Sequence, residues 1–303
     1  MAKMTWPKLL KLIAEGRGRG HRDEYKPWLR IHRRNPSGRG NQVVAVLPGY
    51  RRSSHFMARV EAHLALLCLY LGAWDVREQF PLWPVPHMHP LADLHEAMPS
   101  NRPTMRGLIE IAKEAGIVHG QEIGSKGVPY VATVDLAVTL GPHASSRLAA
   151  VSLKPHSEIL AAYATDRVVE RLELERRYLA EAGAHHSIVE QKLLGKYTGG
   201  NLELFSSGAR LPMHLEHECL IGEFCERLFD QAVSQPIGTA IDTVAAVMKL
   251  PAADASFLWR HGVWQRRIEL DVTLPLRMDK PIVSLGKEIC AALSLELFGE
   301  VLS

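Results

Sequence analysis

Lys154 closes a short apolar run, Ala149 to Leu153, and is followed directly by Pro155. The run is too short and too uniform for an exposed helix, so we expect a buried strand that ends at the lysine. A lysine in that setting is most often the first solvated residue after a strand. The alternative is that its ammonium group points into a catalytic site, on the same strand face as Ser152. Such a site requires carboxylates from elsewhere in the chain.

Asp135 interrupts an otherwise apolar strand pattern, VATVDLAVTL. A lone carboxylate in such a strand is costly unless it is paired or bound to a metal. Residues 128–154 have the pattern of a hairpin, which would place Asp135 beside the end of the second strand. Glu61 lies at the edge of the apolar stripe of a helix expected over residues 58–72 and can point onto this sheet. We therefore expect Glu61, Asp135 and Lys154 to converge.

Two carboxylates beside a lysine predict a particular kind of metal chemistry. Hard oxygen ligands suit Mg²⁺, which keeps several waters and takes only one or two protein carboxylates, and Mn²⁺ is expected to substitute for it. Such a metal turns a bound water into a nucleophile and neutralises charge on a scissile phosphate. The pattern therefore predicts metal-dependent hydrolysis of a phosphodiester.

The elements that must position these residues can be read from periodicity. We expect a mixed α/β sheet flanked by helices, built before residue 200. Between its second strand and its hairpin, residues 84–127 look like an insertion with a polar helix. The expected strands cover 41–49, 74–84, the two arms of 128–154, and 187–191, and the expected helices cover 58–72 and 167–183.

The sequence beyond residue 205 has a mainly helical pattern. It predicts one long helix and two short helices joined by a turn at Pro251, followed by an alternating pattern that suggests a two-stranded ribbon. Helix, helix and ribbon are typical of a winged-helix-like module, although a plain helical packing domain is the alternative. His214, His217, Cys219 and Cys225 all fall on the long predicted helix, so they cannot converge on a zinc ion. The helices are expected at 213–233, 239–250 and 253–262, and the ribbon at 263–276 and 281–285.

The charge of the chain is unevenly distributed. Residues 1–60 hold 14 of the 36 Lys and Arg residues and 3 of the 33 Asp and Glu residues, a local balance of +11 against −8 for the rest. Arginines interleaved with glycines let guanidinium groups and backbone amides approach phosphates closely. The alternative is a solvated, flexible arm. The DNA-binding candidates are Arg17, Arg19, Arg22, Lys26, Arg33 and Arg34.

Composition sets the broad class. The chain has 303 residues, 47% of them hydrophobic and 23% charged, which is enough to bury a sizeable core. Its four scattered cysteines favour reduced thiols over a disulfide framework. The N-terminal segment lacks the features of a secretory signal, and no run has the length of a membrane span, so we expect a cytoplasmic protein that is not bound to a membrane.

A glutamate on a helix, an aspartate in a strand and a lysine closing the next strand resemble the PD-(D/E)xK nuclease superfamily. Flanking motifs narrow the resemblance. The segments REQFPL, TVDLAV, SLKP and LELERRY occur in this order and are similar to those of the TnsA-type endonucleases of heteromeric cut-and-paste transposases. The resemblance covers about residues 12–180 well and the C-terminal part only in outline.

The resemblance implies a restriction-endonuclease-like fold and Mg²⁺-dependent nicking at the 5′ ends of a transposon. A TnsB-type transposase would cut and join the 3′ ends, and a TnsC-type ATP-dependent regulator would contact the C-terminal part. Glu61 and Asp135 would be the catalytic carboxylates and metal ligands, Lys154 the catalytic lysine, and Leu153 would offer its backbone carbonyl to the metal.

One position departs from the family pattern. Ser152 stands two residues before the lysine, where the family has Asp, Glu or Gln. A serine can hold a metal-bound water but supplies no charge. Glu78, in REQF on the neighbouring strand, is a candidate substitute or outer ligand; the alternative for Glu78 is a structural pair with Arg77.

Three regions follow from this interpretation. They are a basic arm with the N-terminal segment of the nuclease domain at 1–60, a nuclease core at 61–200, and a winged-helix-like C-terminal domain at 205–303. Two other functions remain open. A stand-alone repair or junction nuclease would use the same three residues, whereas a non-catalytic winged-helix DNA-binding regulator would leave Asp135 without a use.

Overall fold

The computed structural model describes residues 4–32, 41–94, 102–121, 127–141, 145–154, 166–283 and 285–302. Nine α-helices and six strands lie within these ranges. None of these helices is both long enough and apolar enough to cross a membrane.

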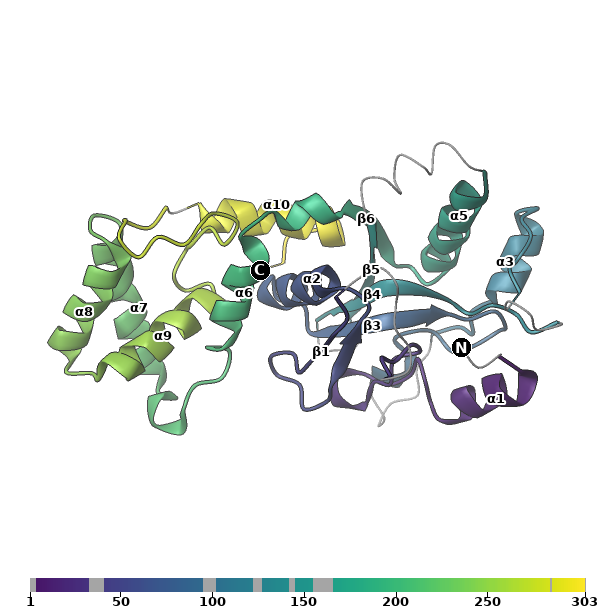
Figure 1. The fold of residues 1–303 in the computed structure, drawn as a ribbon, viewed down its shortest axis with the longest axis horizontal. Helices are drawn as coiled ribbons and strands as arrows, with labels where there is room; N and C mark the ends of the chain where they lie inside the picture. Colours follow the sequence, from purple (N-terminus) through teal and green to yellow (C-terminus); the bar gives the residue numbers. More distant parts are fainter. Residues whose placement is uncertain are drawn as a thin grey trace.

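A four-stranded mixed sheet forms the centre of the N-terminal half (Figure 1). Its strand order is β3-β4-β5-β6, with antiparallel pairing from β3 to β5 and a parallel pair between β5 and β6. The predicted hairpin is confirmed as β4 and β5. A separate ribbon pairs β1 with β2. The strands are β1 (Val43–Ala45), β2 (Ser54–Phe56), β3 (Asp75–Leu82), β4 (Ala132–Leu140), β5 (Arg147–Lys154) and β6 (His185–Glu190).

Helices cover both faces of the sheet, because its strands are apolar on both faces. Helix α2 (Arg59–Tyr70) packs on one face, and its Leu64 and Leu67 belong to one core cluster with Leu136 and Val151. Helices α3 (Leu108–Glu114) and α5 (Asp166–Glu181) pack on the other face. Side chains alternate along β5, so Ala150 packs toward α5 while Val151 packs toward α2. The predicted α/β class is confirmed.

The N-terminal segment is folded onto the sheet. Thr5 caps helix α1 (Trp6–Ala14), and a single 3₁₀ turn, η1, covers Arg22–Glu24. Tyr25 stacks on Phe80 at 6.4 Å between ring centroids. Gly18 has a φ of +76°, and a Cβ there would lie 2.2 Å from the ring of Pro81. The alternative of a solvated, flexible arm is therefore wrong for residues 4–32.

The C-terminal half is helical, as predicted, but its expected ribbon is wrong. Helices α6 (Thr198–Ser206), α7 (Glu218–Ala232), α8 (Ile237–Met248) and α9 (Ala252–Trp264) are followed by irregular chain and by α10 (Gly286–Phe298). Met213–Leu215 forms a 3₁₀ turn, η4, so the long predicted helix begins only at Glu218. Among the described residues after Glu190 no strand is present. The winged-helix prediction is not confirmed.

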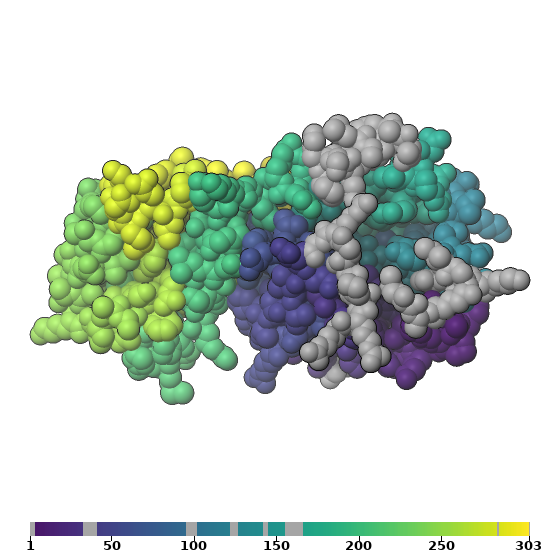
Figure 2. All heavy atoms as spheres, in the orientation of Figure 1, coloured from purple at the N-terminus to yellow at the C-terminus, as the bar shows by residue number. Residues whose placement is uncertain are grey.

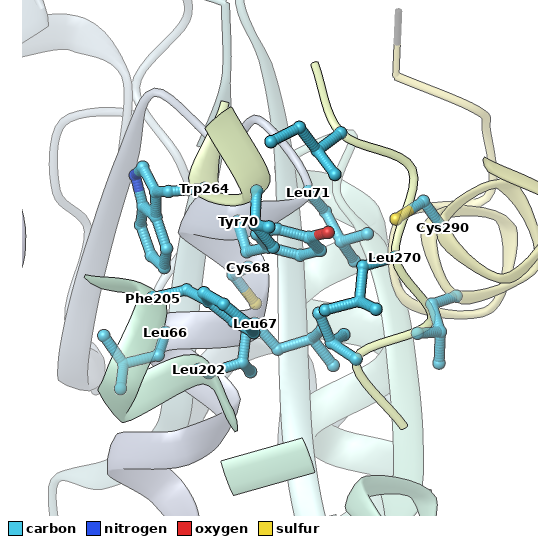
Figure 3. Close-up of a cluster of buried hydrophobic side chains, with 14 of the residues drawn as sticks. Leu66, Leu67, Cys68, Tyr70, Leu71, Leu202, Phe205, Trp264, Leu270 and Cys290 are labelled. Carbon is cyan, nitrogen blue, oxygen red and sulfur yellow. The ribbon is translucent and has the colours of Figure 1, made fainter. Parts of the chain in front are cut away.

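One hydrophobic core joins the two halves. Figure 3 shows α2 side chains packed against Phe205 of α6, Trp264 of α9 and Cys290 of α10. Helix α10 returns to the sheet, where the Ser187 hydroxyl of β6 donates to the carbonyls of Glu296 and Leu297. In Figure 2 the C-terminal helices, green to yellow, are continuous with the N-terminal half. The predicted boundary between residues 200 and 205 stays a prediction, and the core crosses it.

Candidate active site

The β4–β5 ladder opens where Asp135 lies. Paired residues run from Leu140↔Arg147 to Leu136↔Val151, and the ladder stops there. Beyond that point the Leu153 N–H donates to Asp135 Oδ2 at 2.7 Å. A buried N–H requires an acceptor, and the carboxylate takes the place of the carbonyl that a continued ladder would supply. Asp135 therefore lies in the opening between the two strands, beside the end of β5 as predicted.

Glu61 approaches the same opening from the first turn of α2. Its side chain is 8% exposed, and its Oε2 accepts from the Met57 N–H at 2.9 Å and from Gln79 Nε2 at 3.2 Å. Burial, together with repulsion from the Asp135 carboxylate, raises the pKa of Glu61 to about 7. Two carboxylates near enough to repel each other form a place where a cation would be stabilised.

Lys154 ends β5 and is half-buried on the face that carries Ser152. Burial raises the pKa of Glu175, on α5, and attraction to Lys154 opposes that rise. Burial and the charge of Lys154 lower the pKa of His186, on β6, to about 4. The negative charge of Asp135 also raises the pKa of Glu175. Glu61 and Asp135 thus lie near enough to repel each other, and Asp135 and Lys154 both act on the pKa of Glu175, while convergence of all three residues stays a prediction.

Glu175 is an acidic residue of this region that the sequence interpretation missed. It is 5% exposed, and its Oε2 accepts from the Ser152 hydroxyl at 3.3 Å. Ser152 Oγ also lies 3.1 Å from His186 Nε2. The signal was present in LELERRY, where Glu175 falls among the inward-facing residues Leu174, Tyr178 and Leu179. A glutamate in the apolar stripe of a helix is unusual enough to mark a paired or functional group.

Glu78 is held elsewhere. Its two carboxylate oxygens accept from Arg52 Nη1 at 2.7 Å and Nη2 at 2.8 Å, and Oε1 also accepts from the His55 N–H. Arg77 instead donates to the Pro90 carbonyl and lies 3.8 Å from Asp75. Glu78 therefore pairs with Arg52 and not with Arg77, so the alternative of a pair with Arg77 is wrong. This bidentate contact does not favour Glu78 as a substitute metal ligand.

Glu78→Gln is expected to act on stability. The change leaves the nearly buried Arg52 guanidinium without its counter-charge, so the free energy of unfolding should fall by about 3 kcal/mol. Urea denaturation measures this loss, and Glu173→Gln, which breaks a more exposed pair on α5, should cost less than about 1 kcal/mol. A Glu78→Gln protein as stable as wild type would contradict the structural role.

The donor set fits a small, hard cation. Within the described ranges no group of three or more His, Cys, Asp or Glu side chains is placed to hold a metal ion. The site offers two carboxylates and the backbone at the end of β5. Mg²⁺ is commonly bound by one or two carboxylates and retains several waters, so two carboxylates are sufficient for it.

The predicted DNA-binding residues are used in different ways. Arg22 donates to the carbonyls of Trp74 at 2.6 Å and Gly49 at 3.0 Å, and Arg17 donates to that of Trp28 at 3.2 Å. Three of the six residues, Arg17, Arg22 and Lys26, therefore bond to backbone carbonyls of their own chain, and Arg19 is exposed. Arg33 and Arg34 lie outside the described residues.

The fold and the site together indicate a class of protein. A mixed α/β sheet with two carboxylates and a lysine at the opening between two strands is compatible with a nuclease fold. No family model matches the chain. It is 29% identical over 199 residues to the transposon Tn7 transposition protein TnsA of Escherichia coli. The match covers 65% of this chain and 61% of that protein, so the chain is similar to TnsA over part of the length of each.

Proposed function

We propose that the protein is the endonuclease subunit of a heteromeric transposase and nicks the 5′ ends of a transposon during cut-and-paste transposition. The observation that carries the proposal is that Asp135 lies in the β4–β5 opening, bonded to the Leu153 N–H, with Glu61 near enough to repel it and Lys154 following Leu153 at the end of β5. The similarity to a transposition protein supports the choice of DNA as substrate.

Glu61 and Asp135 would hold a divalent cation, Mg²⁺ or Mn²⁺. The N–H and C=O of one strand residue face the same neighbour, so the Leu153 carbonyl is turned toward Asp135 and can join them. When bound, the cation would neutralise charge on the scissile phosphate and lower the pKa of a water molecule. It would also relieve the repulsion that raises the pKa of Glu61.

Lys154 would donate hydrogen bonds to the phosphate and to the attacking water. Lys154 lies on the strand face that carries Ser152, where the charge of Glu175 would partly balance that of the ammonium group. Stabilising the negative charge that develops on a phosphate is the principal demand of phosphodiester hydrolysis. Ser152, bonded to Glu175, would act through that carboxylate and not as a ligand of its own.

Partners are proposed from the similarity alone. A TnsB-type transposase would process the 3′ ends, and a TnsC-type ATP-dependent regulator would contact the C-terminal helices. Domain boundaries at 1–60, 61–200 and 205–303 belong to the same proposal.

The test is cleavage of a plasmid that carries matched transposon ends. Purified protein is incubated with Mg²⁺, with Mn²⁺ or with EDTA, in the presence and absence of the two partner proteins, and nicks are mapped on each strand. We expect metal-dependent nicks at the 5′ ends that require the partners. Nicking without partners would instead identify a stand-alone nuclease, and DNA binding without any nicking would identify a regulator.

Arginines of the N-terminal segment should separate into structural and DNA-contacting residues. Arg19 is exposed, so Arg19→Ala should preserve the thermal unfolding temperature while lowering the log–log salt slope of DNA binding by about 0.9. Arg22→Ala removes two hydrogen bonds to carbonyls, so it should reduce the unfolding free energy by about 1 to 3 kcal/mol. An unchanged salt slope in Arg19→Ala would exclude that residue from the DNA contact.

A further inference from the structure

Gln79 has an unusual backbone for the middle of a strand. It lies within β3, is 3% exposed, and has a φ of +49°. That left-handed conformation costs an L-residue other than glycine roughly 1 to 2 kcal/mol. Buried non-glycine residues in sparsely populated backbone regions persist only where the surroundings enforce them, and they gather at functional sites.

The strain coincides with a gap in the sheet. Glu78 pairs with Leu136 and Phe80 pairs with Val134, so the register is the same on both sides of Gln79. By that register Gln79 faces Asp135, and this is the one position of the β3–β4 ladder, as described from Asp75 to Leu82, that is not paired. The pairing of β3 with β4 is therefore interrupted at the position of Gln79 and Asp135.

The side chain of Gln79 uses the turned backbone to reach Glu61. Its Nε2 donates to Glu61 Oε2 at 3.2 Å, and its Oε1 accepts from the Thr133 hydroxyl at 3.3 Å. Thr133 lies two residues before Asp135 on β4. The amide thus ties the α2 carboxylate to the strand that carries the second carboxylate.

We propose that Gln79 is a positioning residue whose left-handed backbone holds its amide between Thr133 and Glu61 and so fixes the Glu61 carboxylate opposite Asp135 for a divalent cation. The inference rests on the proposed metal site. Partners that orient metal ligands through hydrogen bonds typically change metal affinity by about 10- to 100-fold when they are removed. Gln79 is expected to act on cation affinity without contacting the cation.

The test measures Mn²⁺ affinity directly, by titration followed by electron paramagnetic resonance of free Mn²⁺, with thermal unfolding of the metal-free protein beside it. Asparagine tolerates the left-handed backbone, but its amide is about 1.5 Å shorter and cannot reach Glu61. Gln79→Asn should therefore weaken Mn²⁺ binding by about tenfold. Its unfolding temperature should stay within about 2 °C of wild type.

A second variant removes the same hydrogen bond without shortening the side chain. Gln79→Glu has the same reach, but its carboxylate cannot donate to Glu61 Oε2, so loss of the orienting hydrogen bond should weaken Mn²⁺ binding in this variant too. The metal-free protein should unfold at least about 2 °C lower, because the added charge repels Glu61. Lys249→Asn is the matched control, since Lys249 has a φ of +55° at the exposed end of α8 and should leave Mn²⁺ affinity unchanged.

Asp135→Asn, measured in parallel, distinguishes a failure of the positioning role of Gln79 from a failure of the proposed metal site. If it weakens Mn²⁺ binding while Gln79→Asn and Gln79→Glu both match wild type, the metal site stands and the positioning role of Gln79 is overturned. If Asp135→Asn leaves Mn²⁺ binding unchanged, the proposed metal site itself fails.

Discussion

Replacing Asp135 with asparagine is expected to abolish DNA cleavage while preserving the fold. The asparagine carbonyl can still accept the hydrogen bond from the Leu153 N–H, so the β4–β5 opening keeps its shape. Only the negative charge is lost, and with it a cation ligand. The cleavage rate should fall by at least about 10³-fold, or about 4 kcal/mol in activation free energy.

The matched control for this change is Asp271→Asn. Asp135 is half-buried, and Asp271 is a buried aspartate, 7% exposed, whose carboxylate bonds to Thr273 in the C-terminal half. It should cleave DNA at the wild-type rate. Plasmid nicking and gel-shift binding are measured for both variants, since DNA affinity should survive in both. Asp135→Asn cleavage within tenfold of wild type would remove Asp135 from the proposed site.

Much of the N-terminal fold could be predicted because its signals are local. The apolar stripe of α2, the apolar strands β4 and β5, and the charged amphipathic α5 each follow from periodicity over a single element. Asp135 could be found for a related reason, since a charge within an apolar strand has few explanations. The cost of that charge is visible without knowing what lies beside it.

The C-terminal ribbon was wrong because alternation reports burial and not strand pairing. Ile268, Leu270 and Val272, three of the four apolar residues in that alternation, are buried, but the fourth, Leu274, is 41% exposed. The chain that carries them is irregular: Arg266 has a φ of +59°, and the Asp271 carboxylate caps the Thr273 N–H in a tight turn. Short alternating segments therefore need an independent signal for pairing before a ribbon is assigned.

Two residues of the site could not be placed by local patterns. Gln79 sits in what reads as ordinary strand, because nothing in neighbouring residues encodes a left-handed glutamine. Glu175 reaches Ser152 from 23 residues away, after the chain has crossed from β5 to α5. Sequence spacing instead favoured Glu78, whose true partner, Arg52, lies 26 residues before it.

Glu175→Gln is expected to lower the cleavage rate by about 10²-fold, or about 2.7 kcal/mol. Glu175 is the buried acid beside Lys154, and it supplies negative charge on the strand face where Ser152 cannot. Glutamine has the same size and can still accept from the Ser152 hydroxyl, so the packing between α5 and β5 should persist. The loss should appear in the cleavage rate of the DNA complex, with DNA affinity unchanged, because Glu175 is buried away from solvent.

Three further variants test whether Ser152 acts through Glu175. Glu173→Gln, two residues earlier on the outer face of α5, is the matched control and should cleave at the wild-type rate. Ser152→Ala should cost about tenfold, as expected for one supporting hydrogen bond. Since the two residues form one contact, the double variant should be no slower than Glu175→Gln alone. Losses that simply multiply in the double variant would mean that Ser152 contributes independently, and full activity in Glu175→Gln would exclude Glu175 from the site.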